Sequence, residues 1–405
     1  MDQLDLKSEW KYVPLNEVID LVIDYRGKTP KKLGGDWSNH GYRALSAKNI
    51  KTGEIVQLEN IRYVDSNLYK KWMKDEIQRC DILLTSEAPF GEVYYWDSDE
   101  KIVLSQRLFA LRCKAEFYPP YVYHYMTTMR FQAELRSRAT GTTVTGLRQP
   151  ELLKCGINCP EYSEQVVIAD TLSTIEKRIA INKTINHNLE QQCFALYRHL
   201  FIEEAMPEWE TGTIVDLGEV VGGSTPSKAK VEYYAEQGIA WITPKDLSIN
   251  KNKFISRGAE DITELGLRNS SAQLMPRGTA LFSSRAPIGY IAIANGEVCT
   301  NQGFKSVIPK KSVGTAFVYF FLKDNIQTIE SMASGSTFKE VSGSIMKSIP
   351  AIIPDVHTLT IFNNACAPIF EQQELLEQEN AHLVMLRDTL LPHLMSGELS
   401  ITDLC

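Results

Sequence analysis

The sequence lacks a long apolar run. No stretch of 18 or more apolar residues appears among its 405 residues, and a membrane-spanning helix requires a stretch of that length. The first residues, Met1 to Asp5, carry neither the basic nor the apolar segment of a secretory signal. We therefore expect a cytoplasmic protein with no membrane segment.

The sequence also lacks the residue spacings of common catalytic and metal sites. Its eight cysteines are scattered, and Cys155 and Cys159 have no second Cys or His pair nearby to complete a four-ligand zinc site. There is no Gly-x-x-x-x-Gly-Lys-Ser/Thr phosphate loop and no nucleophile elbow. The seven histidines form no evident catalytic pair. We expect no metal, no cofactor and no chemistry carried out by this chain.

One segment imitates the Asn/Asp-Pro-Pro-Tyr tetrad of amino-methylating enzymes. It reads Tyr118-Pro119-Pro120-Tyr121, and a tyrosine at the first position cannot present the required amide or carboxylate. Prolines at the start of a helix are well tolerated, because the first helical N–H groups have no partner in the helix. We interpret this segment as a helix start.

The net charge of −7 is unevenly distributed. Residues 1–160 sum to +2, 161–207 to −3, 208–354 to +1 and 355–405 to −7. A strongly acidic surface would repel the phosphates of a nucleic acid. The near-neutral segments 1–160 and 208–354 remain compatible with a basic face, whereas the C-terminal segment is not.

The sequence contains an internal repeat. Residues 82–91, Ile-Leu-Leu-Thr-Ser-Glu-Ala-Pro-Phe-Gly, match residues 280–289, Ala-Leu-Phe-Ser-Ser-Arg-Ala-Pro-Ile-Gly, at an offset of 198. Further matches have offsets between 194 and 197: 26–30 with 222–226, 44–50 with 241–247, 105–106 with 301–302, and 141–143 with 335–337. Such a small drift means few insertions, so the two halves should share one fold.

Each half combines short strands with a helix. The predicted strands are rich in β-branched and aromatic residues and bounded by Gly, Pro or Asp: 82–84, 93–96, 102–104, 279–282, 290–293 and 305–308. Helices are predicted over 121–138 and 317–332. We therefore expect two α+β domains, at 1–160 and 208–354, and two helical segments, at 161–207 and 355–405.

The two helical segments carry a coiled-coil seam. Apolar or small polar residues recur at 4-3 spacing: Ile168, Leu172, Ile175, Ile179, Asn182, Asn186, Leu189, Cys193, Leu196 and Leu200. The same seam recurs 194 residues later, with more polar interruptions. We predict that the two long helices pack antiparallel, related by a pseudo-two-fold axis, with the two domains at opposite ends. The equivalent Asn186 and Asn380 could fix the register or fill a solvated gap.

This organisation resembles the specificity subunit of type I restriction-modification enzymes. The resemblance covers nearly the whole chain and rests on Gly141-Thr142-Thr143, on Pro160 to Ala169 with Ser163-Glu164-Gln165, and on Leu386 to Leu399. The second helix begins at Pro354 to Leu359 without the Glu-Gln pair. The resemblance implies two target-recognition domains that each read one half of an asymmetric bipartite site in double-stranded DNA. It also implies helices that dock two methyltransferase subunits, with restriction and translocation supplied by further subunits.

Reading bases requires side chains that donate or accept hydrogen bonds, placed on loops. The repeated loops offer candidate DNA-binding residues in the first half: Lys48, Asn49, Ser86, Gln106, Arg107, Thr142, Thr143 and Arg148. Those in the second half are Lys245, Asp246, Ser284, Arg285, Gln302, Ser336, Thr337 and Lys339. For each residue the alternative is a solvated loop or turn-capping role, because Ser, Thr and Asn favour turns.

Two rival functions stay open at the level of sequence. One is a non-catalytic scaffold whose twin domains bind proteins and whose helices oligomerise. The other is a nuclease, which would need paired acidic residues near a lysine, and no such set recurs in both halves.

Overall fold

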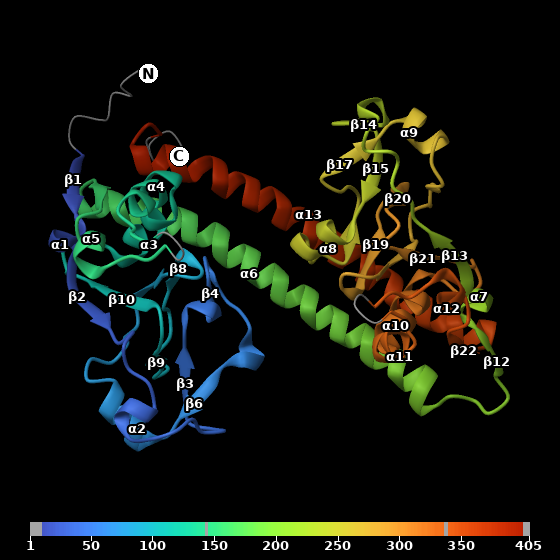
Figure 1. Ribbon diagram of the computed structural model, residues 1–405, viewed down its shortest axis with the longest axis horizontal. Helices are drawn as coiled ribbons and strands as arrows, with labels where there is room; N and C mark the ends of the chain where they lie inside the picture. Colours follow the sequence, from blue (N-terminus) through green and yellow to red (C-terminus); the bar gives the residue numbers. More distant parts are fainter. Residues whose placement is uncertain (1–9, 142–144, 336–338, 400–405) are drawn as a thin grey trace. The chain divides into compact units, whose positions relative to one another are not determined.

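The computed structural model describes residues 10–141, 145–335 and 339–399. Its contacts divide the chain into two units, residues 1–179 with 382–405, and residues 180–381. Both long helices, α6 (Tyr162–Arg198) and α13 (Val356–Ser396), cross this division (Figure 1). Each unit therefore holds one α+β domain and part of each long helix.

The first unit is built around a four-stranded antiparallel sheet in the order β2-β10-β7-β8. A second sheet, β6-β3-β9, and the pairs β1-β11 and β4-β5 complete it. The strands are β1 (Lys11–Pro14), β2 (Ile19–Asp24), β3 (Tyr42–Leu45), β4 (Ile50–Lys51), β5 (Glu54–Ile55), β6 (Arg62–Val64), β7 (Ile82–Ser86), β8 (Phe90–Tyr95), β9 (Val103–Leu104), β10 (Leu108–Cys113) and β11 (Gly156–Cys159). The helices are α1 (Leu15–Val18), η1 (Lys31–Leu33), η2 (Ala47–Asn49), η3 (Leu58–Asn60), α2 (Ser66–Trp72), α3 (Pro119–Thr127), α4 (Met129–Ser137) and α5 (Gln149–Leu152).

The second unit repeats this plan with a five-stranded sheet in the order β13-β21-β18-β19-β16. The sheet β14-β17-β15-β20 and the β12-β22 pair accompany it. The strands are β12 (Glu210–Thr213), β13 (Gly218–Gly222), β14 (Tyr234–Ala235), β15 (Ile239–Ile242), β16 (Phe254–Ile255), β17 (Glu260–Ile262), β18 (Ala280–Ser284), β19 (Ile288–Ala294), β20 (Val298–Thr300), β21 (Lys305–Pro309) and β22 (Pro350–Ile353). The helices are η4 (His199–Glu203), α7 (Ile214–Leu217), η5 (Val231–Tyr233), α8 (Pro244–Ile249), α9 (Glu264–Arg268), α10 (Thr315–Asp324), α11 (Ile326–Ser331) and α12 (Gly343–Lys347).

The central strands β7 and β18 are each buried on both faces, which explains the unbroken apolar runs in their sequences. Ile82 and Leu84 face a core formed with α3 and the long helices, whereas Leu83 faces a second core formed with α2 and β3. In the second unit Phe282 and Leu281 divide in the same way. A strand that is buried on both faces has no polar face, so its residues do not alternate.

The predicted helices over 121–138 and 317–332 are each two helices, which is a correction. Thr128 adopts an extended conformation between α3 and α4, and its hydroxyl accepts a hydrogen bond from the Phe131 N–H at 3.2 Å. That hydroxyl is an N-cap, so a new helix begins where the sequence pattern suggests continuity. In the second half Asn325 separates α10 from α11.

The predicted seam is confirmed, because none of its residues is exposed in α6 or α13. In the first unit the start of α6, at Ile168 and Leu172, packs with Leu394 near the end of α13. In the second unit the end of α6, at Cys193, packs with Phe362 near the start of α13. These contacts make the helices antiparallel, as predicted (Figure 1).

Polar residues of the seam pair across the helices in the second unit. The Asn182 amide donates to Asn380 Oδ1 and to Glu379 Oε2, both at 3.0 Å. The Asn186 amide donates to the Gln373 carbonyl at 3.3 Å, and the Gln373 amide donates to the Asn186 carbonyl at 3.0 Å. Asn186 and Asn380 thus each have a cross-helix partner, which supports the register-setting alternative over a solvated gap.

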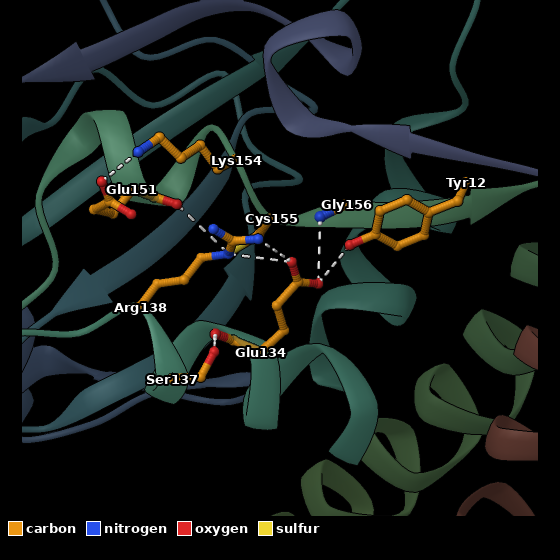
Figure 2. A network of polar contacts seen from close by, with 8 residues as sticks. All are labelled: Tyr12, Glu134, Ser137, Arg138, Glu151, Lys154, Cys155 and Gly156. Atoms are coloured by element: carbon orange, nitrogen blue, oxygen red, sulfur yellow. Dashed lines mark hydrogen bonds and ion pairs between the residues drawn. The ribbon is translucent and has the colours of Figure 1, made fainter.

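A carboxylate network fixes the end of α4, from which the loop before α5 departs (Figure 2). The Tyr12 hydroxyl donates to Glu134 Oε2 at 2.7 Å, and the Gly156 N–H donates to the same oxygen at 3.4 Å. Arg138 donates to Glu134 Oε1 at 3.0 Å. Burial, together with the bond to Glu134, raises the pKa of Tyr12 to about 12. The network therefore ties β1, β11 and α4 together.

A buried ionic cluster joins the domain to the long helices in the second unit. Lys253 is only 7% exposed, and its ammonium lies 2.6 Å from Glu190 Oε2 of α6 and donates to Gln373 Oε1 of α13 at 2.8 Å. The Lys323 ammonium lies 2.5 Å from Glu190 Oε1. Burial alone would raise the pKa of Glu190, but the two ammonium groups outweigh that effect and lower it. The cluster neutralises charges that would be costly to bury alone.

Candidate nucleic-acid interface

Backbone hydrogen bonds gather four loops into one edge of the first domain. We call residues 46–49, 86–89, 105–107 and 140–141 with 145–148 the first loop edge. The Ala47 N–H donates to the Gln106 carbonyl at 3.1 Å, and the Ser86 N–H donates to the Arg107 carbonyl at 2.9 Å. The Leu147 N–H donates to the Ser86 carbonyl at 3.0 Å. Segments up to 100 residues apart in sequence therefore lie side by side.

The second domain has an equivalent second loop edge, residues 242–246, 284–287, 301–303 and 334–335 with 339–341. The Asn301 N–H donates to the Ile242 carbonyl at 3.0 Å, and the Ser284 N–H donates to the Gly303 carbonyl at 2.7 Å. The Val341 N–H donates to the Ser284 carbonyl at 2.9 Å. Both edges also share a cis peptide bond, before Pro89 and before Pro287.

The loop edges present half of the sixteen candidate side chains at the surface. In the first edge these are the exposed Lys48, Gln106, Arg107 and Arg148. In the second edge they are the exposed Lys245, Gln302 and Lys339 and the half-buried Arg285. Cations and amides at the tips of fixed loops can donate hydrogen bonds to phosphates and to base edges.

Four other candidates lie inside the domains. Asn49 closes a capping box, in which its Oδ1 accepts from the Ser46 N–H at 3.1 Å and from the Ser46 hydroxyl at 2.9 Å. Asp246 forms the equivalent box with the Thr243 N–H and hydroxyl, both at 2.7 Å. Ser86 and Ser284 have no exposed surface. These four residues shape the loops and do not offer side chains at the surface.

The remaining four candidates, Thr142, Thr143, Ser336 and Thr337, lie outside the described residues.

The charges of the two loop edges differ at equivalent positions. In the first edge Glu87 lies 3.4 Å from the Arg107 guanidinium. The position of Glu87 is taken by Arg285 in the second edge, which lies 3.5 Å from Glu340. The Lys305 ammonium is 3.8 Å from the same carboxylate, and burial lowers the pKa of Lys305. Similar loops therefore carry opposite charges at one site of the repeat.

Two small hollows adjoin the first loop edge and share the residues Trp37, Ser46, Lys48, Arg62 and Ser105. Gln57 and Asn60 also line one of them, and Gln106 and Arg107 the other. Together their linings contain three cationic side chains and no carboxylate. The Arg62 guanidinium carbon lies 4.1 Å from the centre of the Trp37 ring. Trp37, Asn60 and Arg62 were not among the residues predicted from sequence.

The structure assigns helix-start and packing roles to the motifs that resemble catalytic or metal sites. Pro119 and Pro120 occupy the first positions of α3, as interpreted from the sequence. Cys155 and Cys159 are buried, and burial raises the pKa of each thiol to about 12. Among the described residues no group of three or more His, Cys, Asp or Glu side chains could hold a metal ion. No helix in the described ranges is long and apolar enough to cross a membrane.

Comparison with known proteins identifies the family. The model of the type I restriction modification DNA specificity domain matches residues 7–191 and 206–375. The MjaIX specificity subunit of Methanocaldococcus jannaschii is 39% identical over 180 residues, which cover 42% of this chain and 41% of that protein. The HindI specificity subunit of Haemophilus influenzae is 22% identical over 434 residues, which cover 86% of this chain and 94% of that protein.

The fold has a counterpart among solved structures. The S subunit of a type I restriction-modification system from M. genitalium superposes with a TM-score of 0.57 at 17% identity. The match covers 97% of this chain and 98% of that one. Together with the family match over both halves, it makes this chain a member of the family of type I restriction-modification DNA specificity subunits, which are the non-catalytic subunits of their enzymes.

Proposed function

We propose that each globular domain is a target-recognition domain that contacts one half of a bipartite site in double-stranded DNA. The domains span residues 1–160 and 208–354, and each uses its loop edge. The observation that carries the proposal is the clustering of exposed cationic and amide side chains on equivalent loops, fixed by backbone hydrogen bonds in each domain. Fixed donors of this kind suit both phosphate contacts and base readout.

The differences between the loop edges support an asymmetric target. Glu87 and Arg285 hold equivalent positions and carry opposite charges, and Arg107 corresponds to Gly303. A carboxylate accepts from amino groups such as that of cytosine, whereas an arginine donates to guanine. Two loop edges with different donors and acceptors would therefore select different sequences in the two half-sites.

The helical segments 161–207 and 355–405 serve in this proposal as the docking surface for two methyltransferase subunits. Exposed apolar residues recur at equivalent positions of the two helices: Val167 (43% exposed) with Ile361 (49%), and Ile181 (52%) with Leu375 (59%). The same exposed apolar positions on both helices suit two copies of one partner, and restriction and translocase subunits would complete the complex.

Methylation profiling tests the proposal. The chain and its methyltransferase subunits are expressed together in a host that lacks other DNA methyltransferases, and modified adenines are mapped across the genome. The expected result is one bipartite, asymmetric motif that disappears when this chain is omitted. A genome without any such motif, while the complex assembles, would overturn DNA recognition and favour the scaffold alternative.

A further inference from the structure

The corner of the first domain that carries Trp37 and Arg62 has a counterpart in the second domain. Strand pairing relates the two places, because Ala44 lies opposite Arg62 in β3-β6, and Trp241 lies opposite Glu260 in β15-β17. The repeat likewise relates Trp37 to Tyr234, just before these strands. Each domain therefore has an aromatic ring and a charged residue at the same corner of its smaller sheet.

In the first domain this corner is a rigid platform for a cation. Trp37 contacts Trp72 with ring centres 6.2 Å apart, and Trp72 is fully buried and donates its indole N–H to the Leu104 carbonyl at 3.2 Å. The exposed Arg62 places its guanidinium over the Trp37 ring, 4.1 Å from the ring centre. Stacking on an aromatic ring restricts the plane of a guanidinium while leaving its N–H groups free to donate.

Arg62 differs from most arginines of its domain in having no acidic partner. Arg43, Arg79, Arg112 and Arg138 each lie within 3 Å of a carboxylate. Among the described residues no carboxylate lies within 4.0 Å of Arg62, so its charge is not neutralised by the protein. A stacked, exposed and unneutralised guanidinium is prepared to bind an external acceptor.

In the second domain the same corner carries the opposite charge. Glu260 occupies the position of Arg62, and its carboxylate lies 2.5 Å from the Lys228 ammonium. Lys228 in turn lies over Tyr234, 4.1 Å from the ring centre. Both corners thus have a cation over an aromatic ring. In the first domain the cation, Arg62, has no carboxylate partner within the described ranges, whereas in the second domain Lys228 is paired with Glu260.

We infer that the equivalent positions Arg62 and Glu260 determine specificity at one base pair in each half-site. Arg62, held on Trp37, donates to the O6 and N7 acceptors of a guanine in the half-site of the first domain. Glu260, held by Lys228, accepts from an exposed amino group in the other half-site. This inference rests on the proposed DNA recognition and adds the residues at which the two domains differ.

The test compares the methylation motif of the wild-type complex with that of the variants Arg62→Ala, Arg62→Lys and Glu260→Gln. With Arg62→Ala we expect one guanine position of a single half-site to become degenerate, while the other half-site stays unchanged. Arg62→Lys should relax the same position, because an ammonium cannot form the paired hydrogen bonds. Glu260→Gln should alter one position in the opposite half-site.

A quantitative readout uses four duplexes: one with the wild-type motif, and three in which another base replaces the guanine at the affected position. The wild-type complex should methylate the guanine duplex on the order of 5- to 150-fold faster than the three substituted duplexes, and the Arg62→Ala complex should show no such preference. The matched control is Arg79→Ala, which removes an arginine that is already paired with Asp97 and Asp99. Its motif should be that of the wild type.

The outcomes separate this inference from the proposed function. A wild-type complex without a bipartite motif would overturn the proposed function. Two results would overturn base reading by Arg62 while leaving the proposed function in place. In the first, Arg62→Ala keeps the wild-type motif. In the second, Arg62→Ala loses all methylation, whereas Arg62→Lys keeps the wild-type motif. The second pattern would assign Arg62 to a phosphate, where charge is sufficient.

Discussion

Neighbouring residues of the first loop edge have opposite orientations and so different roles. Lys48 is exposed and has no carboxylate within 4.0 Å among the described residues, whereas Asn49 is buried in a capping box. Both were predicted from sequence as DNA-binding residues, since both side chains can donate hydrogen bonds. Only the local turn geometry distinguishes them, because Asn49 is bonded to Ser46 within its own turn.

We expect Lys48→Ala and Asn49→Ala to affect different properties. Lys48→Ala should weaken binding to all duplexes, and the slope of log affinity against log salt concentration should fall by about one. Its stability should change by less than about 0.5 kcal/mol. Asn49→Ala should lower the stability by about 1 kcal/mol through loss of the cap and leave the methylation motif unchanged.

Salt titrations of duplex binding and chemical unfolding of the same preparations measure both effects. A change of motif in Asn49→Ala without loss of stability would show that this side chain reaches DNA after all.

His124 makes the first unit sensitive to acid. The residue is almost fully buried, its Nε2 lies 2.9 Å from the Ser173 hydroxyl, and burial with the nearby Arg387 lowers its pKa to about 3. An unfolded histidine titrates near 6.5, so below that pH the unfolded chain binds a proton that the folded chain excludes. The resulting stability is therefore complete above about pH 6.5 and is lost as the pH falls toward 3.

The variant His124→Phe should remove this pH dependence, because the repeat already places Phe320 at the equivalent position. Between pH 7 and pH 5 the free energy of unfolding should fall more in the wild type than in the variant. Below pH 6.5 the difference should grow by up to about 1.4 kcal/mol per pH unit. Thermal unfolding at the two pH values measures this difference. The exposed His40→Phe serves as the control and should keep the wild-type slope; an equal slope in His124→Phe would contradict the prediction.

At the scale of elements, the order of strands and helices followed from sequence more fully than their breaks. The apolar runs and the 4-3 spacing locate β7, β18, α6 and α13, because burial and helical periodicity impose those patterns directly. The break at Thr128 was not predicted, because threonine occurs in helix interiors as well as at N-caps, and packing decides between the two.

The candidate site shows the same limit. The loops of each edge could be aligned because the repeat preserves them, but Trp37 and Arg62 are 25 residues apart and meet only through packing. Their one signal in the sequence is the charge reversal between Arg62 and Glu260 at an offset of 198, the offset that also relates 82–91 to 280–289.

The ionic cluster of the second unit should contribute to the attachment of its domain to the long helices. Lys253→Met removes the ammonium between Glu190 and Gln373 and leaves a buried carboxylate with fewer partners. We expect a loss of roughly 3–5 kcal/mol, which is typical when one member of a buried pair is removed. Chemical unfolding, with hydrogen exchange in α6 and α13, measures the effect.

The matched control is Lys251→Met, an exposed lysine two residues earlier, which should change stability by less than about 0.5 kcal/mol. The double variant Lys253→Met with Glu190→Gln should recover part of the loss, since the unpaired charge is then absent. Equal effects of Lys253→Met and Lys251→Met would contradict a structural role for the cluster.

For the whole molecule, the repeat predicts how partners assemble. If Val167 and Ile361 each lie under one methyltransferase subunit, then Val167→Asp should remove one copy and Ile361→Asp the other, because a carboxylate buried in an apolar contact is costly. The double variant should bind neither copy. Native mass spectrometry of the complexes counts the copies directly.

Gln191→Asp provides a control on an exposed polar position of α6 and should retain two copies. A complex of Val167→Asp that still contains two methyltransferase subunits would rule out docking at Val167.

The discontinuity of the first unit has a consequence for synthesis on the ribosome. Residues 180–381 form one unbroken unit, whereas the core around Ile168 and Leu172 is completed by Leu394 and Met395, which are made only after that unit. The apolar seam at the start of α6 therefore stays exposed to solvent while the second unit is translated and folds. A ribosome that stops before residue 382 releases a chain whose second unit is complete and whose first unit offers a bare helix face to chaperones and proteases.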